Sequence, residues 1–244
     1  HISLAARIAT RDLRGGARGL WLLIAGVFVG AAAVALVGAT SQSLIDGARQ
    51  GALETIGGDL SLRLYHRPPS EAELTIIHRE GDVSISVELR PMVRAVRNGR
   101  ADGMPVLVEL KGVDRKYPLY GTVETLPAFN LYQEIDLYDG VYGAVADKAL
   151  FAAMELKLGD SLQIGNATYQ LRGVLVAEPD RAFRAFTLGP RIMVLGESLP
   201  ATGVTNDGAE VYYYTSVKLP QESIGQDGAT SAIARIDQAF PQSG

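Results

Sequence analysis

The longest apolar run of the chain lies near its N-terminus. Residues 20–40 read LWLLIAGVFVGAAAVALVGAT and contain no charged side chain. As a helix, this run would extend roughly 31 Å, close to the hydrocarbon thickness of a bilayer at about 30 Å. A helix also satisfies its own backbone hydrogen bonds within lipid. The pattern therefore predicts one transmembrane helix over residues 20–40.

Apolar and polar residues alternate along several later segments, and this period of two predicts strands. Asp59–Leu64 alternates strictly, and Val83–Leu89 repeats the pattern. A hairpin is expected where residues 161–164 and 169–176 flank the Gly165-Asn166 turn. Met92–Val96 and Val106–Leu110 are predicted as paired strands joined around Asn98-Gly99, with Arg100–Pro105 making the loop long. Further strands are predicted at Arg191–Leu195 and Val211–Leu219.

Helical spacing recurs in four segments outside the apolar run. Ser70 and Glu73 form a capping-box pattern that opens a short helix ending at Gly81. The other predicted helices are Ser43–Ile56, which would continue the membrane helix, Ala144–Leu156 and Ile233–Phe240. Strands that arrive as hairpins with short helices between them indicate an α+β domain over residues 41–244.

The charges on either side of the apolar run set its orientation. Arg7, Arg11, Arg14 and Arg18 precede it against the single Asp12. The positive-inside rule places residues 1–19 in the cytoplasm and residues 41–244 on the other side of the membrane. A cleaved signal peptide is the alternative interpretation. The apolar core of a signal peptide usually spans about 7–15 residues, and the run over residues 20–40 is longer.

Small residues are frequent within the apolar run. Gly26 and Gly30 stand four positions apart, and Gly38 follows. Such spacing lets membrane helices approach one another closely, although glycine is common in any membrane helix. We expect these glycines to mark a helix that packs in a bundle.

Composition narrows the class of protein further. The 244 residues are 47% hydrophobic and 20% charged, as in folded domains. Because the chain carries a formal net charge of −4 and residues 1–40 carry +3, residues 41–244 carry −7. This acidic domain is not expected to bind nucleic acid. The absence of cysteine excludes disulfides and thiolate metal sites.

Candidate catalytic and cofactor residues are scarce. His1, His66 and His78 have no partner at a zinc-type spacing. No nucleophile elbow and no phosphate-binding loop occurs. We therefore expect no enzymatic activity, no metal and no cofactor, so any ATP hydrolysis would require another chain or another domain.

Aromatic residues gather in one stretch before the middle of the chain. Tyr117, Tyr120, Phe129 and Tyr132 could line an apolar groove or a protein interface, or could simply belong to the core. The stretch favours a hydrophobic substrate or a periplasmic protein as partner.

Several segments, spread in order over the chain, resemble FtsX/MacB-type ABC transporter permeases, and within that family the YbbP-like members. The matching segments are LAARIATRDLRGGARG at 4–19, IGGDLSLRLYHRP at 56–68, VELKGVDRKYPLYGTVE at 108–124, DGVYGAVADKAL at 139–150, LKLGDSLQIGNATYQLRGVLVAEPDR at 156–181 and TLGPRIMV at 187–194.

The resemblance implies a fold, a location and partners. The fold would be a MacB-like periplasmic core, an α+β periplasmic domain preceded by one transmembrane helix. The chain would lie in the bacterial inner membrane, in contact with lipid, as part of a longer permease. A cytoplasmic ABC ATPase acting in trans and a second permease copy would be its partners. A single-pass anchored interaction or sensor domain is the alternative function.

Overall fold

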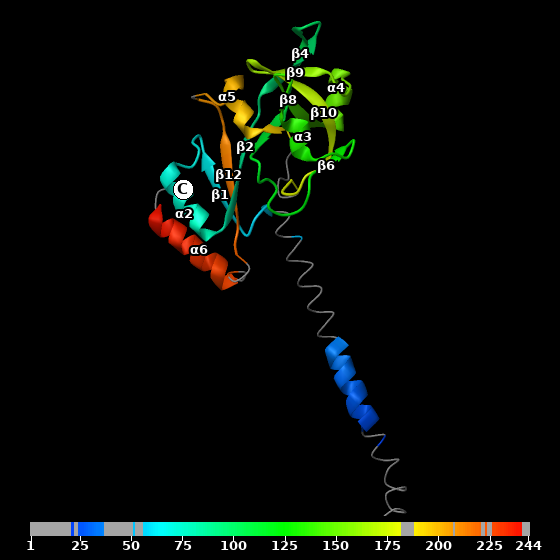
Figure 1. Ribbon diagram of the computed structural model, residues 1–244, viewed down its shortest axis with the longest axis vertical. Helices are drawn as coiled ribbons and strands as arrows, with labels where there is room; N and C mark the ends of the chain where they lie inside the picture. Colours follow the sequence, from blue (N-terminus) through cyan, green and yellow to red (C-terminus); the bar gives the residue numbers. More distant parts are fainter. Residues whose placement is uncertain are drawn as a thin grey trace, which may run out of the picture. The chain divides into compact units, whose positions relative to one another are not determined.

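A computed structural model describes residues 21, 24–36, 51, 56–181, 188–206, 208–220, 223 and 226–240 (Figure 1). The chain divides into two units, His1–Gly51 and Ala52–Gly244, and each is described by itself.

The described part of the first unit is a helix over residues 24–36, with every side chain exposed. The predicted membrane run over residues 20–40 is thus described only in part. Among the described residues, no helix combines the length and the apolar character needed to cross a membrane. Apart from residues 51 and 56, the predicted helical continuation over residues 43–56 lies outside the described residues.

The second unit contains twelve described strands in one mixed sheet. The strands are β1 Leu60–Tyr65, β2 Asp82–Leu89, β3 Met92–Arg97, β4 Arg100–Leu107, β5 Glu109–Val113, β6 Glu124–Leu126, β7 Leu137–Tyr138, β8 Val141–Asp147, β9 Ser161–Ile164, β10 Ala167–Ala177, β11 Arg191–Leu195 and β12 Tyr212–Lys218. The helices are α2 Glu71–Glu80, α3 Leu131–Ile135, α4 Lys148–Met154, the 3-10 turn η1 Gly196–Ser198, α5 Leu199–Thr202 and α6 Gln226–Ala239.

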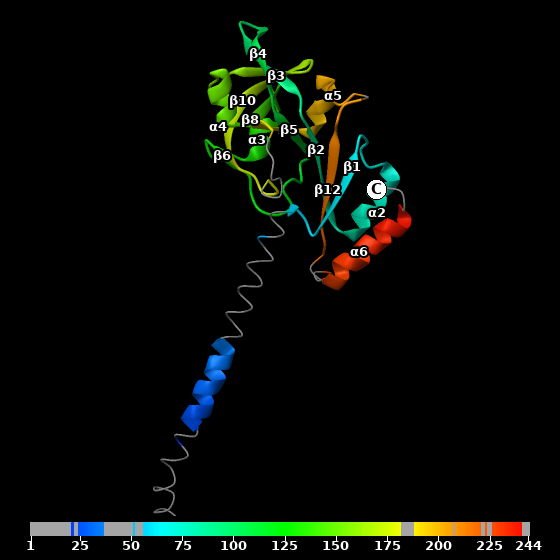
Figure 2. The ribbon, with the colours of Figure 1, turned by 180° about the vertical axis from the view of Figure 1, so that it is seen from behind.

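The order of strands across the sheet is β1-β12-β2-β5-β11-β8-β10-β9-β3-β4. Most neighbours run antiparallel, whereas β5 with β11 and β8 with β10 run parallel. Strands far apart in sequence therefore lie side by side, and β12 returns from the C-terminal part to insert between β1 and β2 (Figure 2). The predicted α+β class is confirmed.

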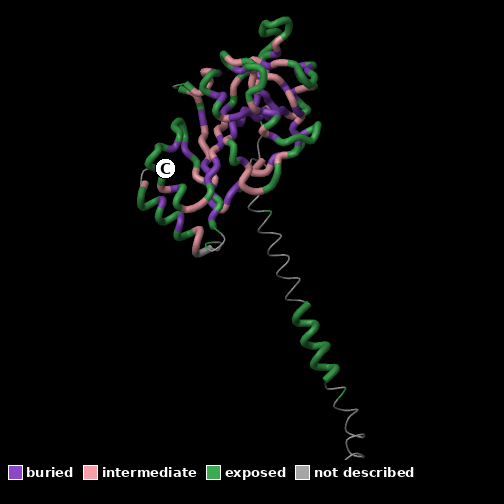
Figure 3. Tube along the Cα trace, in the orientation of Figure 1, coloured by how far each residue is buried: buried purple, intermediate pink, exposed green. Residues whose placement is uncertain are grey.

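Helices cover both faces of the sheet in different places. On one face, α2 and α6 pack over β1, β12 and β2 through Ile77, Ile236 and Val217 (Figure 1). The same face continues into a larger core under α4 and α5. On the opposite face, α3 packs over β5, β8 and β11. Buried residues accordingly concentrate along the central strands (Figure 3).

The capping box predicted for α2 is confirmed. The Ser70 hydroxyl accepts a hydrogen bond from the Glu73 N–H at 3.3 Å, and the Glu73 carboxylate accepts one from the Ser70 N–H at 2.7 Å. The Arg67 guanidinium also donates two hydrogen bonds to this carboxylate, which lowers the pKa of Glu73 to about 2. The start of α2 is thereby fixed beside the end of β1.

The predicted loop over residues 100–105 is wrong. These residues belong to β4, which pairs with β3 from Arg97 opposite Arg100. Asn98 and Gly99 have positive φ angles of 52° and 74° and form a two-residue turn. The first residues of β4 are exposed and need no apolar alternation, so their sequence gives no strand signal (Figure 3).

The helix predicted over residues 144–156 begins later than expected. Ala144, Val145 and Ala146 are completely buried within β8, and α4 starts at Lys148. A short apolar run that is buried on both faces fits a central strand as well as a helix, because its periodicity does not separate the two. The single strand predicted over Val106–Leu110 is instead divided at Val108 between the end of β4 and the start of β5. The other predicted strands and the helix at the C-terminal end are confirmed in β1, β2, β3, β9, β10, β11, β12 and α6.

Candidate functional site

A row of charged and aromatic residues crosses the sheet on the face opposite α2 and α6. Tyr212 lies opposite Glu88, Glu88 opposite Lys111, and Lys111 opposite Met193. Residues paired in this way point to the same side of a sheet. Glu109 and Arg191, paired with each other, lie two residues away along the same strands and share this face. Register therefore places ionic groups of three central strands together.

Lys111 is the most buried ion of this group, with no exposed surface. Its ammonium donates hydrogen bonds to both carboxylate oxygens of Asp180, at 2.8 and 2.7 Å, and to the Tyr117 hydroxyl at 2.9 Å. The Tyr117 hydroxyl in turn donates to Asp180 at 2.8 Å. Glu178 and Glu88 lie farther from the ammonium, at 3.7 and 3.9 Å. Each of the three N–H donors of the ammonium thus has an acceptor within hydrogen-bond distance.

The phenol of Tyr117 is held neutral at this place. Burial raises its pKa well above the ordinary value, and the nearby carboxylates of Asp180 and Glu178 raise it further. A neutral phenol keeps its proton and continues to donate to Asp180. Tyr117 is therefore a structural partner of the Lys111–Asp180 ion pair.

Arg191 is the second buried cation, with 1% of its surface exposed. Its guanidinium lies 3.2 Å from Glu178, 3.5 Å from Glu88 and 3.8 Å from Glu109. These contacts are ion pairs, and within the described residues its Nε atom has no hydrogen-bond partner. Glu178, which is shared by Arg191 and Lys111, joins the two cations into one network. The term "buried ionic network" below refers to Lys111, Arg191, Glu88, Glu109, Glu178 and Asp180.

The network reaches the first residues of the domain. A Cβ atom built on Gly57 would lie 3.3 Å from the Asp180 Cβ, so Asp180 lies beside the backbone at Gly57. Gly57 has a positive φ of 78°, which favours glycine. A Cβ on Gly58 would lie 2.7 Å from the Leu60 carbonyl oxygen. Asp180, which is hydrogen-bonded to Lys111, therefore lies next to the residues that precede β1.

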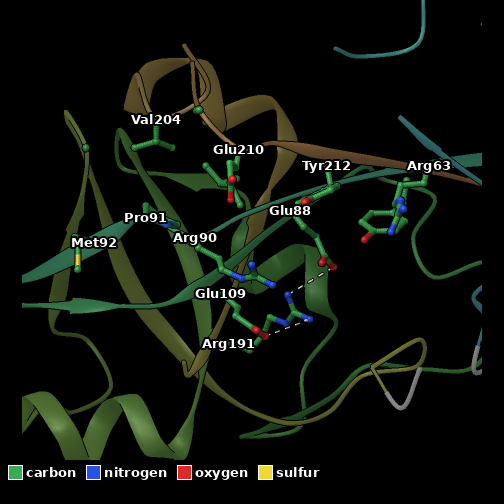
Figure 4. Close-up of a pocket in the computed structure, with 14 residues that line it drawn as sticks. Arg63, Glu88, Arg90, Pro91, Met92, Glu109, Arg191, Val204, Glu210 and Tyr212 are labelled. Atoms are coloured by element: carbon green, nitrogen blue, oxygen red, sulfur yellow. Dashed lines mark ion pairs between the residues drawn. The ribbon is translucent and has the colours of Figure 1, made fainter. Parts of the chain in front are cut away.

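On the other side, the network borders a groove. The groove has a volume of about 630 Å³ and lies over the ends of β2 and β5 and over β12. Arg191, Glu88 and Glu109 line it, and Arg63, Arg90 and Tyr212 lie around them (Figure 4). The volume is typical of sites that hold small ligands. Because Arg191 belongs to both, the groove and the buried ionic network are in direct contact.

Of the four aromatic residues predicted to line an apolar groove or interface, or to belong to the core, the structure brings Tyr117 and Tyr132 together in the core cluster under α3. Tyr117 is buried, while Phe129 is 53% exposed. The Tyr132 hydroxyl donates to the backbone carbonyls of Asp114 and Tyr117, and burial, followed by the Asp114 charge, raises its pKa to about 12. The Tyr120 hydroxyl donates to Asp59 at 2.7 Å. None of the four lines the 630 Å³ groove.

The remaining predicted site residues lie in the first unit. A Cβ on Gly26 or Gly30 would have no neighbouring atom within 4 Å in this single chain. Gly38, Arg7, Arg11, Arg14 and Arg18 lie outside the described residues. Their predicted roles in helix packing and orientation stay predictions.

Sequence reasoning missed the buried ionic network. Lys111 and Arg191 stand within apolar strands, and most of their acidic partners are tens of residues away along the chain. The available signal was their position, because a charged residue inside an otherwise buried strand requires a partner. Within the described residues, no group of acidic and histidine side chains is arranged to hold a metal ion.

These features define a mixed-sheet domain with a buried ionic network in its central strands. The network lies close to the first residues of the domain and borders a groove. The chain belongs to the family of MacB-like periplasmic core domains, whose model matches residues 20–229. It is 27% identical over 192 residues to YbbP of Escherichia coli (strain K12), described as an uncharacterized ABC transporter permease. That alignment covers 79% of this chain and 22% of the relative, so the chain spans less than a quarter of that protein's length. The resemblance stated from the sequence is thereby confirmed.

Three solved structures also show similarity to this chain. The periplasmic region of MacB from Actinobacillus actinomycetemcomitans is 11% identical, with a TM-score of 0.46, over 78% of this chain and 88% of that one. The extracellular domain of the noncanonic ABC-type transporter YknZ from Gram-positive bacteria is 14% identical, with a TM-score of 0.42, over 75% and 95%. A domain of a putative permease protein from Porphyromonas gingivalis is 11% identical, with a TM-score of 0.42, over 68% of each chain.

Proposed function

We propose that this chain is the first membrane segment and periplasmic domain of an ABC transporter permease. It would couple ATP hydrolysis by a separate cytoplasmic ATPase to periplasmic transport or mechanotransmission. The observation that carries the proposal is the family match over residues 20–229, which begins in the apolar run and continues through the mixed sheet into α6. The relative YbbP, described as an ABC transporter permease, supports the same class.

In this proposal the chain has a defined topology. Residues 20–40 cross the bacterial inner membrane, residues 1–19 with their four arginines lie in the cytoplasm, and residues 41–244 lie in the periplasm. Gly26, Gly30 and Gly38 pack against other helices, including those of a second permease copy. The hydrophobic composition of residues 20–40 supports contact with membrane lipid.

The domain would receive movement at its first residues. A continuous helix from Leu20 to about Ile56 would act as a lever, and Gly57 would pass its displacement to Asp180. Because Asp180 is hydrogen-bonded to the fully buried Lys111, the displacement would reach β5 at the centre of the sheet. The position of Asp180 beside the backbone of Gly57 supports this route.

The proposal assigns no catalytic step to this chain. The partner ATPase would carry out the nucleotide chemistry. A hydrophobic substrate or a periplasmic protein would contact the exposed ring of Phe129, which is close in sequence to Tyr120 and Tyr132. A single-pass anchored interaction or sensor domain is the second candidate, because such a protein also needs only one membrane helix and one folded domain.

Breaking the proposed lever should separate ATP hydrolysis from periplasmic output. We expect a Gly-Pro pair inserted after Gln42 to abolish transport or release in the complete permease, because proline removes a backbone hydrogen bond and interrupts a helix. ATP hydrolysis by the assembled complex should continue. Both quantities can be measured on the same reconstituted preparation.

An Ala-Ala pair inserted at the same position is the matched control. It lengthens the segment equally but preserves helical structure, so it should retain more output than the Gly-Pro variant. Full output from the Gly-Pro variant would contradict the lever.

A further inference from the structure

The described sheet ends at β1, and the outer edge of this strand is open. In the order of strands, β1 has β12 on one side and no described strand on the other (Figure 2). The His66 N–H donates to the Val211 carbonyl at 2.9 Å, and hydrogen-bonded positions alternate along an antiparallel pair. The N–H and C=O groups of Ser61, Arg63 and Tyr65 are therefore directed away from β12. Among the described residues, no other backbone hydrogen bond reaches these three residues.

β1 lacks the features that usually protect an edge strand from pairing. Natural edge strands carry prolines, bulges or several charges. β4, at the other end of the sheet, contains Pro105, has a positive φ of 77° at Gly103 and pairs with β3 through a shift in register. β1 reads LSLRLY, with neither proline nor glycine and with one charge. Between its buried leucines, Leu62 stays partly exposed, so an added strand would also cover apolar surface.

The connections that flank β12 indicate which segment fits this edge. β1 and β2 both run antiparallel to β12, so they are parallel to each other, and α2 joins them across β12. α6 follows β12 and packs on the same face as α2, where the Arg235 guanidinium donates to Glu80 at 2.9 Å. Two strand-helix-strand units whose strands interleave in one sheet form the split βαβ motif. Here the first unit is complete, and the second consists of β12 and α6.

The handedness of the connections gives the direction in which the second unit continues. Crossovers between parallel strands are almost always right-handed. β12 runs opposite to β1, while α6 lies on the same face as α2. A connection of the same hand must therefore leave β12 in the opposite direction, which is across β1. The far side of β2 is also occupied, because β2 pairs with β5. In the described sheet, a strand that follows α6 thus fits at the outer edge of β1.

We propose that the segment following residue 244 in the complete protein forms a strand that pairs antiparallel with the outer edge of β1. This strand satisfies the backbone groups of Ser61, Arg63 and Tyr65 and completes the second unit. Because it runs opposite to β1, the chain leaves the domain beside Asp59, next to the place where it enters. Movement of the membrane part would then reach the sheet through two neighbouring strands. The proposal rests on the proposed function in one respect, that the complete protein continues beyond residue 244.

Hydrogen–deuterium exchange at single amides tests the added strand. The samples are the 244-residue chain, the same chain extended by the next segment of the complete protein, and the complete protein, all in nanodiscs. An extension of about 15 residues provides a short loop and a strand of ordinary length. We expect the amides of Ser61, Arg63 and Tyr65 to exchange at least about 100-fold more slowly in both longer chains. The amides of Leu62 and Leu64 face β12 and are the internal control, because they are protected in all three samples.

A proline substitution then locates the contact. The Arg63 N–H is directed away from β12, and edge strands tolerate proline at such positions, so the 244-residue chain with Arg63→Pro should keep its circular dichroism spectrum. In the extended chain, the same substitution should return the exchange of Ser61 and Tyr65 to the rates of the 244-residue chain, because proline cannot donate to the added strand. Ala101→Pro, at an exposed position of β4, is the matched control and should leave the protection of β1 unchanged.

Three results would overturn the proposal. Equal exchange of the Ser61, Arg63 and Tyr65 amides with and without the extension would show that the following segment does not pair there. Slow exchange of these amides in the 244-residue chain itself would show that its edge is already covered. Slow exchange in the complete protein but not in the extended chain would assign the edge to a different segment or to a second copy. Because no sample contains an ATPase, these results would leave the permease proposal to its own experiments.

Discussion

Lys111→Met lowers the free energy of unfolding of the chain by about 3–5 kcal/mol, the range typical of a buried ion pair that loses one partner. Methionine fills a similar volume, so the loss is electrostatic. Asp180 would lose the ammonium that donates to both of its oxygens at 2.7–2.8 Å, and the buried Glu178 would lose one of its two cations. Urea denaturation followed by circular dichroism measures the loss.

Two further variants separate this effect from a general loss of positive charge. Lys116→Met removes an exposed lysine close by in sequence and should change stability by less than about 0.5 kcal/mol. Adding Asp180→Asn to Lys111→Met should recover about 1–3 kcal/mol, because the uncompensated carboxylate is then neutral. A loss below about 1 kcal/mol in Lys111→Met would contradict the buried ionic network.

Gly143→Ala should destabilise the domain by more than about 4 kcal/mol or prevent its folding. Gly143 lies in β8, where a Cβ would approach the Glu134 carbonyl oxygen to 1.7 Å and its carbon to 2.8 Å. Both atoms belong to the backbone at α3, and the Gly143 N–H also donates to the Asp136 carbonyl at 3.3 Å. Neither segment can move aside without separating α3 from the sheet. Thermal unfolding and the yield of folded protein report the effect.

Gly112→Ala is the matched comparison for this substitution. Gly112 is also a buried strand glycine, but a Cβ there would first meet the Leu199 Cδ1 atom, at 2.5 Å. The end of a leucine side chain can rotate, so the expected loss is about 1–3 kcal/mol. Equal losses in the two variants would show that the backbone contact at Glu134 is not the cause.

Much of the fold could be predicted from local patterns. The alternation of Leu60, Leu62 and Leu64 identifies β1 because one face of that strand packs on helices. The Ser70–Glu73 pair identifies the start of α2 because its hydrogen bonds are local. Two predictions were wrong for different reasons. The exposed residues at the start of β4 show no alternation that would predict a strand, and the buried alanines of β8 fit a strand and a helix equally well.

The site was harder to predict because tertiary register creates it. Lys111 meets Glu88 only because β5 pairs with β2, and Arg191 joins them only because β11 lies beside β5. Asp180 arrives from a connection outside these strands. The spacing of these charged residues along the chain does not predict that they meet in the fold. Tyr117, Tyr120 and Tyr132 were predicted as site residues only because they are close together in sequence.

The buried ionic network gives physical meaning to the family match. A domain that receives force at its first residues needs a firm connection from those residues to the centre of its sheet. Under the proposed function, the Lys111–Asp180 pair would provide this connection, because Asp180 lies beside Gly57 and is hydrogen-bonded to the buried Lys111.

Copurification of an ATPase with the complete protein tests whether this chain belongs to an ABC transporter permease. The complete protein that contains this chain should be purified from its native membrane under mild conditions, and the associated proteins identified by mass spectrometry. An ATPase with a phosphate-binding loop should copurify in stoichiometric amount, and its rate of ATP hydrolysis should differ when the permease is present. A folded, membrane-extracted protein that reproducibly carries no ATPase would contradict the permease function.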